Sequence, residues 1–167
     1  MTLRSVVCGV DGSGDARAAL HVAAGLAGRL DLRLVAVHVV QPPLPSSGGV
    51  GPSDRHAAAV GADALLVAGR ELVDRMLGEE DLVDAAARIE LGFPGDRLAD
   101  VADEEDAELI VVGSRGRGPF KAALLGSVSA DVIGVARCPV VVVPRSSGSP
   151  RGGQPAAAGA ATYEGAR

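Results

Sequence analysis

The chain has few aromatic residues: two phenylalanines, one tyrosine and no tryptophan among 167 residues. Hydrophobic residues nevertheless make up 47% of the sequence, so valine, alanine and leucine must fill the core. Proteins that bind nucleic acids usually present a basic face and often stack bases on aromatic side chains. Because aromatic residues are scarce and the formal net charge is -5, we expect no nucleic-acid partner.

Long apolar runs are also absent. The apolar runs of the chain, such as Val140–Val143, cover only a few residues, whereas a membrane span needs about 20. The first residues lack the longer apolar region and the cleavage site of a secretory signal. Two cysteines, Cys8 and Cys138, do not make a disulfide framework and are typical of buried thiols in a reducing compartment. These observations predict a cytoplasmic protein with no membrane contact.

Strand-like and helix-like segments alternate along the chain. Short, continuous apolar runs predict buried strands at residues 5–10, 32–40, 86–91, 109–112 and 138–143. Apolar residues at helical spacing predict helices at residues 14–30, 56–77, 96–105 and 127–136. This alternation indicates an α/β fold, a single doubly wound domain whose parallel sheet has helices on both faces.

The first two predicted helices each have one apolar side. Ser13 precedes the first helix and is predicted to cap it. The residues expected to be buried in that helix are Ala16, Ala19, Leu20, Ala23, Ala27 and Leu30. Those expected to be buried in the second are Leu65, Leu66, Ala68, Leu72, Val73 and Met76, and Gly78 is expected to end this helix.

Two segments are poor in regular structure. The window from Gln41 to Asp54 is rich in proline and glycine, which excludes a regular element. The residues after Pro144 lack the apolar content that ordering requires. We therefore expect one domain at residues 1–144 and a flexible tail at residues 145–167.

A basic glycine loop is the most informative feature of the sequence. The apolar run 109–112 leads into Gly113, Gly116 and Gly126-Ser127, with the spacing G-x2-G-x9-G-S. Residues 109–130 include Arg115, Arg117 and Lys121 but no aspartate or glutamate. A glycine loop that enters a helix start suits an anion, because the backbone can approach closely and the helix amides carry partial positive charge. We expect a nucleotide phosphate there, with Arg115 and Arg117 as candidate phosphate contacts.

The position of this loop supports a ligand site. In parallel sheets, ligands bind beyond the carboxyl ends of the strands, where the strand order reverses. The first predicted strand ends at Asp11-Gly12 and the fourth at Gly113. If these strands are neighbours, their two loops face each other.

Other nucleotide and catalytic motifs do not fit. A P-loop requires lysine where Pro119 stands, and a dinucleotide fingerprint requires a third glycine where Arg17 stands. The three histidines, at positions 21, 38 and 56, lack metal-binding spacing, and the serines near the loops lack evident His and Asp partners. We assign no catalytic residue and no metal ligand.

These residues resemble the universal stress protein family. The nucleotide motif of that family is G-x2-G-x9-G-[ST], which Gly113, Gly116, Gly126 and Ser127 match position for position. The opening VVCGVDGS, the segment AVHVV and the final CPVVVV also resemble family strands. The resemblance covers residues 1–144.

The resemblance implies a five-stranded parallel sheet in the order 3-2-1-4-5 and, because the motif is intact, ATP binding. The residues that it places around the nucleotide are Val10, Asp11, Val39, Val112, Gly113, Gly116, Gly126, Ser127, Val128 and Ser129. It places Val10 and Asp11 against the nucleoside, Val39 behind the adenine, and the remainder around the ribose and phosphates. Mg²⁺ or Mn²⁺ often accompanies the nucleotide in this family, and Val140–Val143 is expected to pair with a second copy in a homodimer.

The resulting hypothesis is a nucleotide-dependent regulator of the stress response with slow or absent ATP hydrolysis. Two alternatives remain. One is a ligand-free dimerising module, which would bind no nucleotide. The other is an ATP-cleaving enzyme of a related α/β fold, whose SGG-x-DS loop the residues from Asp11 to Asp15 only faintly resemble.

Overall fold

The computed structural model describes residues 4–41, 52–116 and 125–144, and only the backbone of residues 52–60. Within these residues, strands and helices alternate as predicted. The elements are β1 (Ser5–Gly9), α1 (Gly14–Leu30), β2 (Arg33–Val40), α2 (Pro52–Glu79), β3 (Ala86–Leu91), α3 (Pro94–Glu104), β4 (Ala107–Gly113), α4 (Ser127–Val135) and β5 (Val140–Val143). The predicted tail and residues 42–51 of the predicted loop lie outside the described residues. Residues 52–54 of that loop belong to α2, so the prediction that the segment contains no regular element was wrong there.

The five strands form one parallel sheet in the order β3-β2-β1-β4-β5. This confirms the order that the family resemblance implied. In the central strand, Val7 pairs with Val35 of β2 on one side and with Ile110 of β4 on the other. The strand order therefore reverses between β1 and β4, and the loops that follow these two strands lie side by side.

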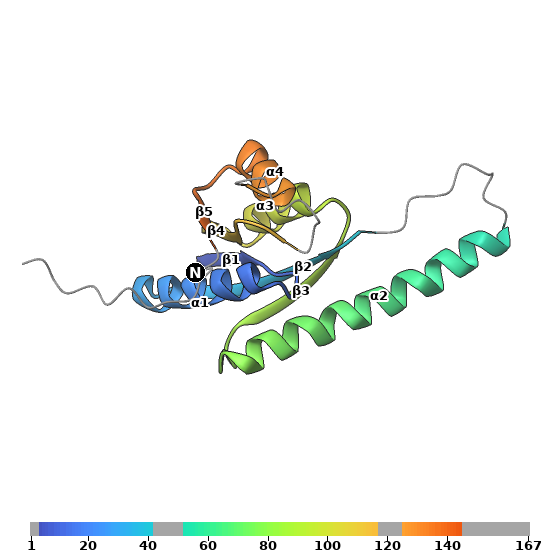
Figure 1. Cartoon of the computed structure of the whole chain (residues 1–167), viewed down its shortest axis with the longest axis horizontal. Coiled ribbons are helices and arrows are strands. Elements are labelled where there is room, and N and C mark those ends of the chain that lie inside the picture. Colours follow the sequence, from blue (N-terminus) through green and yellow to red (C-terminus); the bar gives the residue numbers. More distant parts are fainter. Residues whose placement is uncertain (1–3, 42–51, 117–124, 145–167) are drawn as a thin grey trace, which may run out of the picture.

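Helices cover both faces of the sheet, as predicted (Figure 1). The α1 and α2 helices pack on one face, where Val6 and Cys8 of β1 belong to the same apolar cluster as Leu20 and Val73. The α3 and α4 helices pack on the other face, where Val7 and Ile110 belong to a second apolar cluster. Because neighbouring residues of a strand point to opposite faces, the continuous apolar strands of the sequence supply both clusters.

The first two helices differ in part from the sequence-based expectation. Ser13 caps α1 as predicted, because its hydroxyl oxygen accepts a hydrogen bond of 3.1 Å from the Ala16 amide. Leu30, however, is 52% exposed, because it is the last residue of α1 and lies beyond the buried part of the helix. The prediction of its burial was wrong.

In α2, the predicted burial of Leu65 and Ala68 was also wrong, since both are exposed. The helix has 28 residues, a length of about 42 Å at ~1.5 Å per residue. The neighbouring strand β2 has only eight residues, a length of about 26 Å. One end of α2 therefore extends past the sheet (Figure 1), and the buried apolar residues Val73, Met76 and Leu77 lie near its other end. Gly78 does not end the helix, which continues to Glu79.

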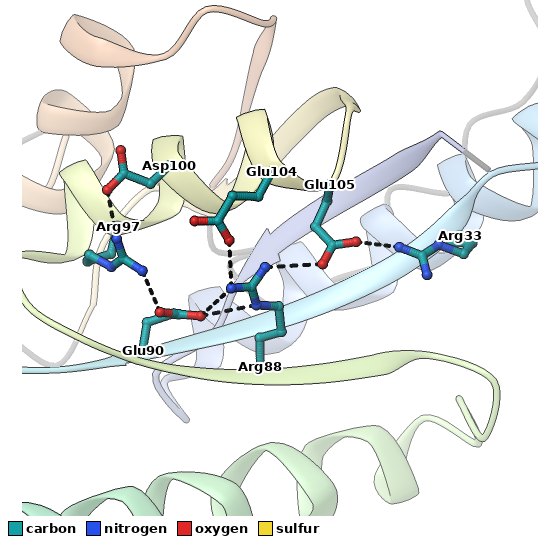
Figure 2. Close-up of polar contacts among 7 residues, drawn as sticks. All are labelled: Arg33, Arg88, Glu90, Arg97, Asp100, Glu104 and Glu105. Atoms are coloured by element: carbon teal, nitrogen blue, oxygen red, sulfur yellow. Dashed lines mark hydrogen bonds and ion pairs between the residues drawn. The ribbon is translucent and has the colours of Figure 1, made fainter. Parts of the chain in front are cut away.

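A charged network lies between the edge strand β3 and α3 (Figure 2). Its members are Arg33, Arg88, Glu90, Arg97, Asp100, Glu104 and Glu105. The Glu90 carboxylate accepts hydrogen bonds from Arg88 at 2.7 Å and from Arg97 at 2.6 Å, and its side chain is 14% exposed. Partial burial acts to raise the pKa of Glu90, but the hydrogen bonds from Arg97 and Arg88 outweigh it and hold the pKa below its ordinary value.

This network predicts a pH-dependent loss of stability. Because the pKa of Glu90 is lower in the folded chain, its contribution is present above the unfolded pKa of about 4.3 and is lost as the pH falls through the folded value. We expect Glu90→Gln to reduce the free energy of unfolding by about 1 kcal/mol at neutral pH and by much less below about pH 4. Urea unfolding across this pH range measures the difference. Asp63→Asn, an exposed change on α2, is the control, and a Glu90→Gln effect that is independent of pH would contradict the assignment.

Candidate functional site

The loops after β1 and β4 meet at the carboxyl edge of the sheet, where the strand order reverses. Val10 and Asp11 follow β1, and Gly113 ends β4. Two helices also begin here, because α1 follows the first loop at Gly14 and α4 follows the second at Ser127. The chain therefore brings the two predicted glycine loops together.

Gly113 lies directly against the start of α1. A Cβ atom at this position would lie 2.7 Å from the backbone carbonyl carbon of Asp15, so no larger residue fits without movement of the helix. The next residue, Ser114, donates a hydrogen bond of 3.0 Å from its hydroxyl group to the Asp15 carboxylate. Asp15 is 1% and Ser114 8% exposed. This buried polar pair joins the first turn of α1 to the end of β4.

Neither Asp15 nor Ser114 was among the predicted site residues. A signal for Asp15 was present, because it lies four residues before Ala19 and therefore on the same face of α1 as the buried alanines. Ser114 gave no such signal, since its partner is 99 positions away in the sequence.

The other two motif glycines allow the β4–α4 loop to fold close to its surroundings. A Cβ atom at Gly116 would lie 2.6 Å from a carboxylate oxygen of Asp11. A Cβ atom at Gly126 would lie 3.3 Å from the Ser114 carbonyl oxygen and from the Arg115 Cα atom. The Gly126 amide also donates a 2.7 Å hydrogen bond to that same carbonyl oxygen. Close contacts within the protein thus explain why glycine stands at all three motif positions. Any affinity of the loop for an anion must come from groups that the folded loop leaves accessible.

The start of α4 offers such groups. Gly126 is the N-cap residue and supplies no side chain to the first amides of the helix, and the first turn contains no acidic residue. Ser127 is exposed and Val128 half-buried. The hydroxyl group of Ser129 donates a 2.7 Å hydrogen bond to the Gly113 carbonyl oxygen, which holds the helix start against the end of β4. An uncapped helix start of this kind carries partial positive charge and attracts anions.

The start of α1 is different, although it lies at the same edge. Its N-cap hydroxyl already accepts the Ala16 amide, and the Asp11 carboxylate accepts a 2.9 Å hydrogen bond from the Ser13 amide. Asp15 adds a negative charge to its first turn. Of the two helix starts, α4 is therefore the one that suits a phosphate.

The predicted nucleoside contacts lie on two sides of the sheet. Val10 is 4% exposed and packs with the α1–α2 cluster, whereas Val112 is 3% exposed and packs with the α3–α4 cluster. Val39 is half-buried. The Val10 carbonyl lies 2.8 Å from Nδ1 of His38, which requires the proton on that nitrogen. Because their side chains are in the core, Val10 and Val112 would meet a ligand mainly through their backbone.

Arg115 is exposed beside the loop, and Arg117 and Lys121 lie outside the described residues. In the described part of the chain, no three His, Cys, Asp or Glu side chains are grouped closely enough to hold a metal ion.

Both cysteines are free, and burial raises the pKa of the Cys8 thiol to about 12. No described helix has the length and apolar character that a bilayer crossing requires.

Comparison with known proteins agrees with this geometry. The model of the universal stress protein family matches residues 2–144. The chain belongs to the universal stress protein family. The match includes the β4–α4 loop together with the strand before it and the helix after it.

Curated relatives include two proteins of Mycobacterium tuberculosis. Universal stress protein Rv2005c is 33% identical over 146 residues, which is 83% of this chain and 47% of the relative. The chain thus spans about half the length of this relative. Universal stress protein Rv1636 is 32% identical over 152 residues and is matched along 95% of its length. The family therefore includes proteins with one such unit and longer proteins.

Solved structures share the fold. The universal stress protein UspA from Lactobacillus plantarum has a TM-score of 0.70 at 24% identity, over 86% of this chain and 99% of that one. A universal stress protein whose structure was determined in complex with cAMP has a TM-score of 0.58 at 28% identity, over 87% of this chain and 100% of that one. The first likeness supports the α/β architecture alone.

The buried pair at this site predicts a stability effect. Ser114→Ala removes a hydroxyl donor from a carboxylate that is almost fully buried. We expect the free energy of unfolding to fall by about 1–3 kcal/mol, since a buried charged group loses a partner. Denaturant unfolding measures this change. Ser127→Ala, at an exposed serine of the same site, should change it by less than ~0.5 kcal/mol; equal stability of the two variants would show that Asp15 does not depend on Ser114.

Proposed function

We propose that this chain binds an adenine nucleotide, ATP, and acts as a nucleotide-dependent regulator of the stress response in the cytoplasm. The observation that carries the proposal is the start of α4, which has no side-chain cap and which Ser129 holds against the end of β4. The loop that precedes this helix carries Arg115. Such a helix start, next to a point where the strand order reverses, is a common phosphate site in parallel α/β proteins. The proposed binding unit is residues 1–144, with residues 145–167 outside it.

In this proposal the nucleotide lies across the ends of β1 and β4. The phosphates contact the loop and the α4 start, at Gly113, Gly116, Gly126, Ser127, Val128 and Ser129, and the nucleoside contacts Val10, Asp11, Val39 and Val112. Arg115 and Arg117 supply positive charge to the phosphates. Mg²⁺ or Mn²⁺ would be held mainly by phosphate oxygens, consistent with the lack of a cluster of three metal-binding side chains among the described residues.

Support for a nucleotide also comes from the related protein determined in complex with cAMP, which is 28% identical to this chain. Cyclic AMP and ATP share the adenine and the ribose and differ in the number of phosphate groups. The intact glycine motif of the loop, with Arg115 and Arg117 in it, favours the ligand with more negative charge.

We propose binding without rapid turnover. Hydrolysis needs a group that orients the attacking water and charge stabilisation at the γ-phosphate. Serines are the side chains that the described part of α4 presents to the site, and serine is a weak base at neutral pH. The described groups therefore suit ground-state binding better than a transition state.

The glycine at the start of α4 provides the first test. A side chain at position 126 would meet backbone atoms at 3.3 Å and fill the space in front of the helix amides. We expect Gly126→Val to abolish Mg-ATP binding in isothermal titration calorimetry while the melting curve remains cooperative. Gly25→Val is the matched control, because a Cβ atom there has no neighbour within 4 Å, and it should bind as the parent chain does.

The same titrations separate the alternatives. Unchanged Mg-ATP affinity in Gly126→Val would place the site elsewhere. Tighter binding of cAMP than of ATP would replace ATP as the ligand and keep the site. Absence of binding of either nucleotide to the parent chain would favour the ligand-free dimerising module. Phosphate release at the ~1–10³ s⁻¹ usual for enzymes, abolished by Gly126→Val, would favour the ATP-cleaving enzyme.

We also propose a homodimer through the edge strand β5. Within the described residues, β5 pairs with β4 on one side and with no strand on the other. The carbonyl groups of Pro139 and Val143 accept hydrogen bonds from β4. Because backbone groups alternate in direction along a strand, those of Val140 and Val142 point away from β4. An apolar edge with free donors is suited to pairing with a second copy.

Replacement of one outward-pointing donor tests the dimer. Val142→Pro removes an amide that faces away from β4, so we expect the mass in light scattering at micromolar concentration to change from two chains to one. Val142→Ala shortens the side chain but keeps the amide and should remain dimeric. A parent chain with the mass of a monomer would refute the proposal, as would a Val142→Pro variant that stays dimeric.

A further inference from the structure

A groove lies outside the candidate nucleotide site, between the start of α3 and the outer face of α4. These two helices pack against each other on one side of the sheet (Figure 1). The groove has a volume of about 440 Å³, and Phe93, Asp96, Asp131 and Val135 are among the residues that line it. Nothing in the proposed nucleotide function uses these side chains.

Two glycines line the groove. A Cβ atom at Gly95 would lie 2.5 Å from the Cβ atom of Asp131, so glycine here lets α3 approach α4 closely. Gly134 is exposed, and a Cβ atom there would meet no atom within 4 Å. The described chain therefore does not require glycine at position 134 for packing, and the surface beside it is open.

The groove also contains an exposed aromatic residue. Phe93 is the only phenylalanine, tyrosine or tryptophan among the described residues, and it is 68% exposed instead of buried in the core. Val135, at the same groove, is 46% exposed. Large apolar side chains that gather at a surface depression commonly mark a site of interaction.

The charged side chains that the described residues place at the groove have one sign. Asp96 and Asp131 line it, and none of its described lining residues is a lysine or an arginine. Neither aspartate forms a hydrogen bond or an ion pair with another described residue. Further along α3, by contrast, Asp100 and Glu104 are paired with arginines (Figure 2). Asp96 lies in the first turn of α3, where its negative charge interacts favourably with the partial positive charge of the helix start. Asp131 has no such interaction, because it lies in the middle of α4.

A guanidinium group matches this combination. It is planar and always charged, it stacks on an aromatic face, and it forms paired hydrogen bonds with carboxylates. Its aliphatic stem would lie over the glycines, and its head would reach the two aspartates. We propose that the groove binds an extended segment of a partner protein and takes an arginine of that segment between Phe93, Asp96 and Asp131.

The inference can be tested by NMR on the full ¹⁵N-labelled chain without nucleotide. The probe is the peptide acetyl-Gly-Leu-Arg-Leu-Gly-amide, and the control peptide has citrulline, which is uncharged and similar in shape, in place of arginine. We expect shifts of the Gly95, Asp96 and Gly134 amides that saturate with a Kd of about 1 mM or lower. The citrulline peptide should bind about tenfold more weakly, and added salt should weaken the arginine peptide.

Three variants test the residues of the groove. Asp96→Asn combined with Asp131→Asn keeps the shape and removes both charges, and we expect about tenfold weaker binding of the arginine peptide. Phe93→Leu should weaken binding severalfold. Gly134→Leu fills the groove and should abolish binding, while the higher helix propensity of leucine supports α4. Asp63→Asn, an exposed change on α2, removes one negative charge away from the groove and is the control that should bind as the parent chain does.

Several outcomes would overturn the inference. They are equal affinity for the arginine and citrulline peptides, shifts confined to other surfaces, and the absence of shifts up to about 5 mM peptide, where a complex with a Kd of ~1 mM would be largely formed. Spermidine that competes fully with the peptide and binds more tightly would assign the groove to a free polyamine instead of a protein segment. Because no nucleotide is present, the result is independent of the nucleotide titrations.

Discussion

The close approach of β4 to the first turn of α1 is the constraint on which the candidate site depends. Gly113 and the backbone of Asp15 are so near that a single Cβ atom would lie 2.7 Å from the carbonyl carbon. At the same contact between β4 and α1, the buried Ser114 hydroxyl donates a hydrogen bond to the Asp15 carboxylate. The loops after β1 and β4, which are far apart in the sequence, share one edge of the sheet because these strands are parallel neighbours, and this contact sets how closely the two loops approach. Without the contact between Gly113 and Asp15, the loop after β1 would not lie close to the start of α4.

The two helix starts at this edge differ in what remains unsatisfied. The α1 start is capped by Ser13 and flanked by Asp11 in the preceding loop, and Asp15 adds a negative charge in its first turn. The α4 start has a glycine at the N-cap and no acid in its first turn. In our proposal, a phosphate satisfies these amides. The same nine-residue helix carries the groove on its outer face, so the two proposed ligands would contact one rigid element.

The sequence was sufficient to predict the fold class and the Ser13 cap, because strand runs and caps are local patterns. It predicted that the two glycine loops meet only on the condition that the first and fourth strands are neighbours. The family resemblance supplied the strand order. Periodicity was not sufficient for Leu30, Leu65 and Ala68, since it identifies the apolar side of a helix and not how far the helix extends past the sheet. The Ser114–Asp15 pair and the Arg33–Glu105 pair of the charged network join residues 99 and 72 positions apart in the sequence, which no local pattern encodes. The residues of the candidate site remain predictions.

The two edges of the sheet differ in how strongly they oppose the addition of another strand, and this difference limits how the chain can associate. At the β3 edge, Arg88 and Glu90 place paired charges beneath α3 (Figure 2), and charged residues at an edge oppose strand addition. At the β5 edge, four consecutive valines carry no charge, and the amides of Val140 and Val142 face away from β4. Pairing of a second copy at β3 would disturb the ion pairs there, whereas pairing at β5 would satisfy free donors. If the chain forms a symmetric dimer, β5 is therefore the edge that physical chemistry favours.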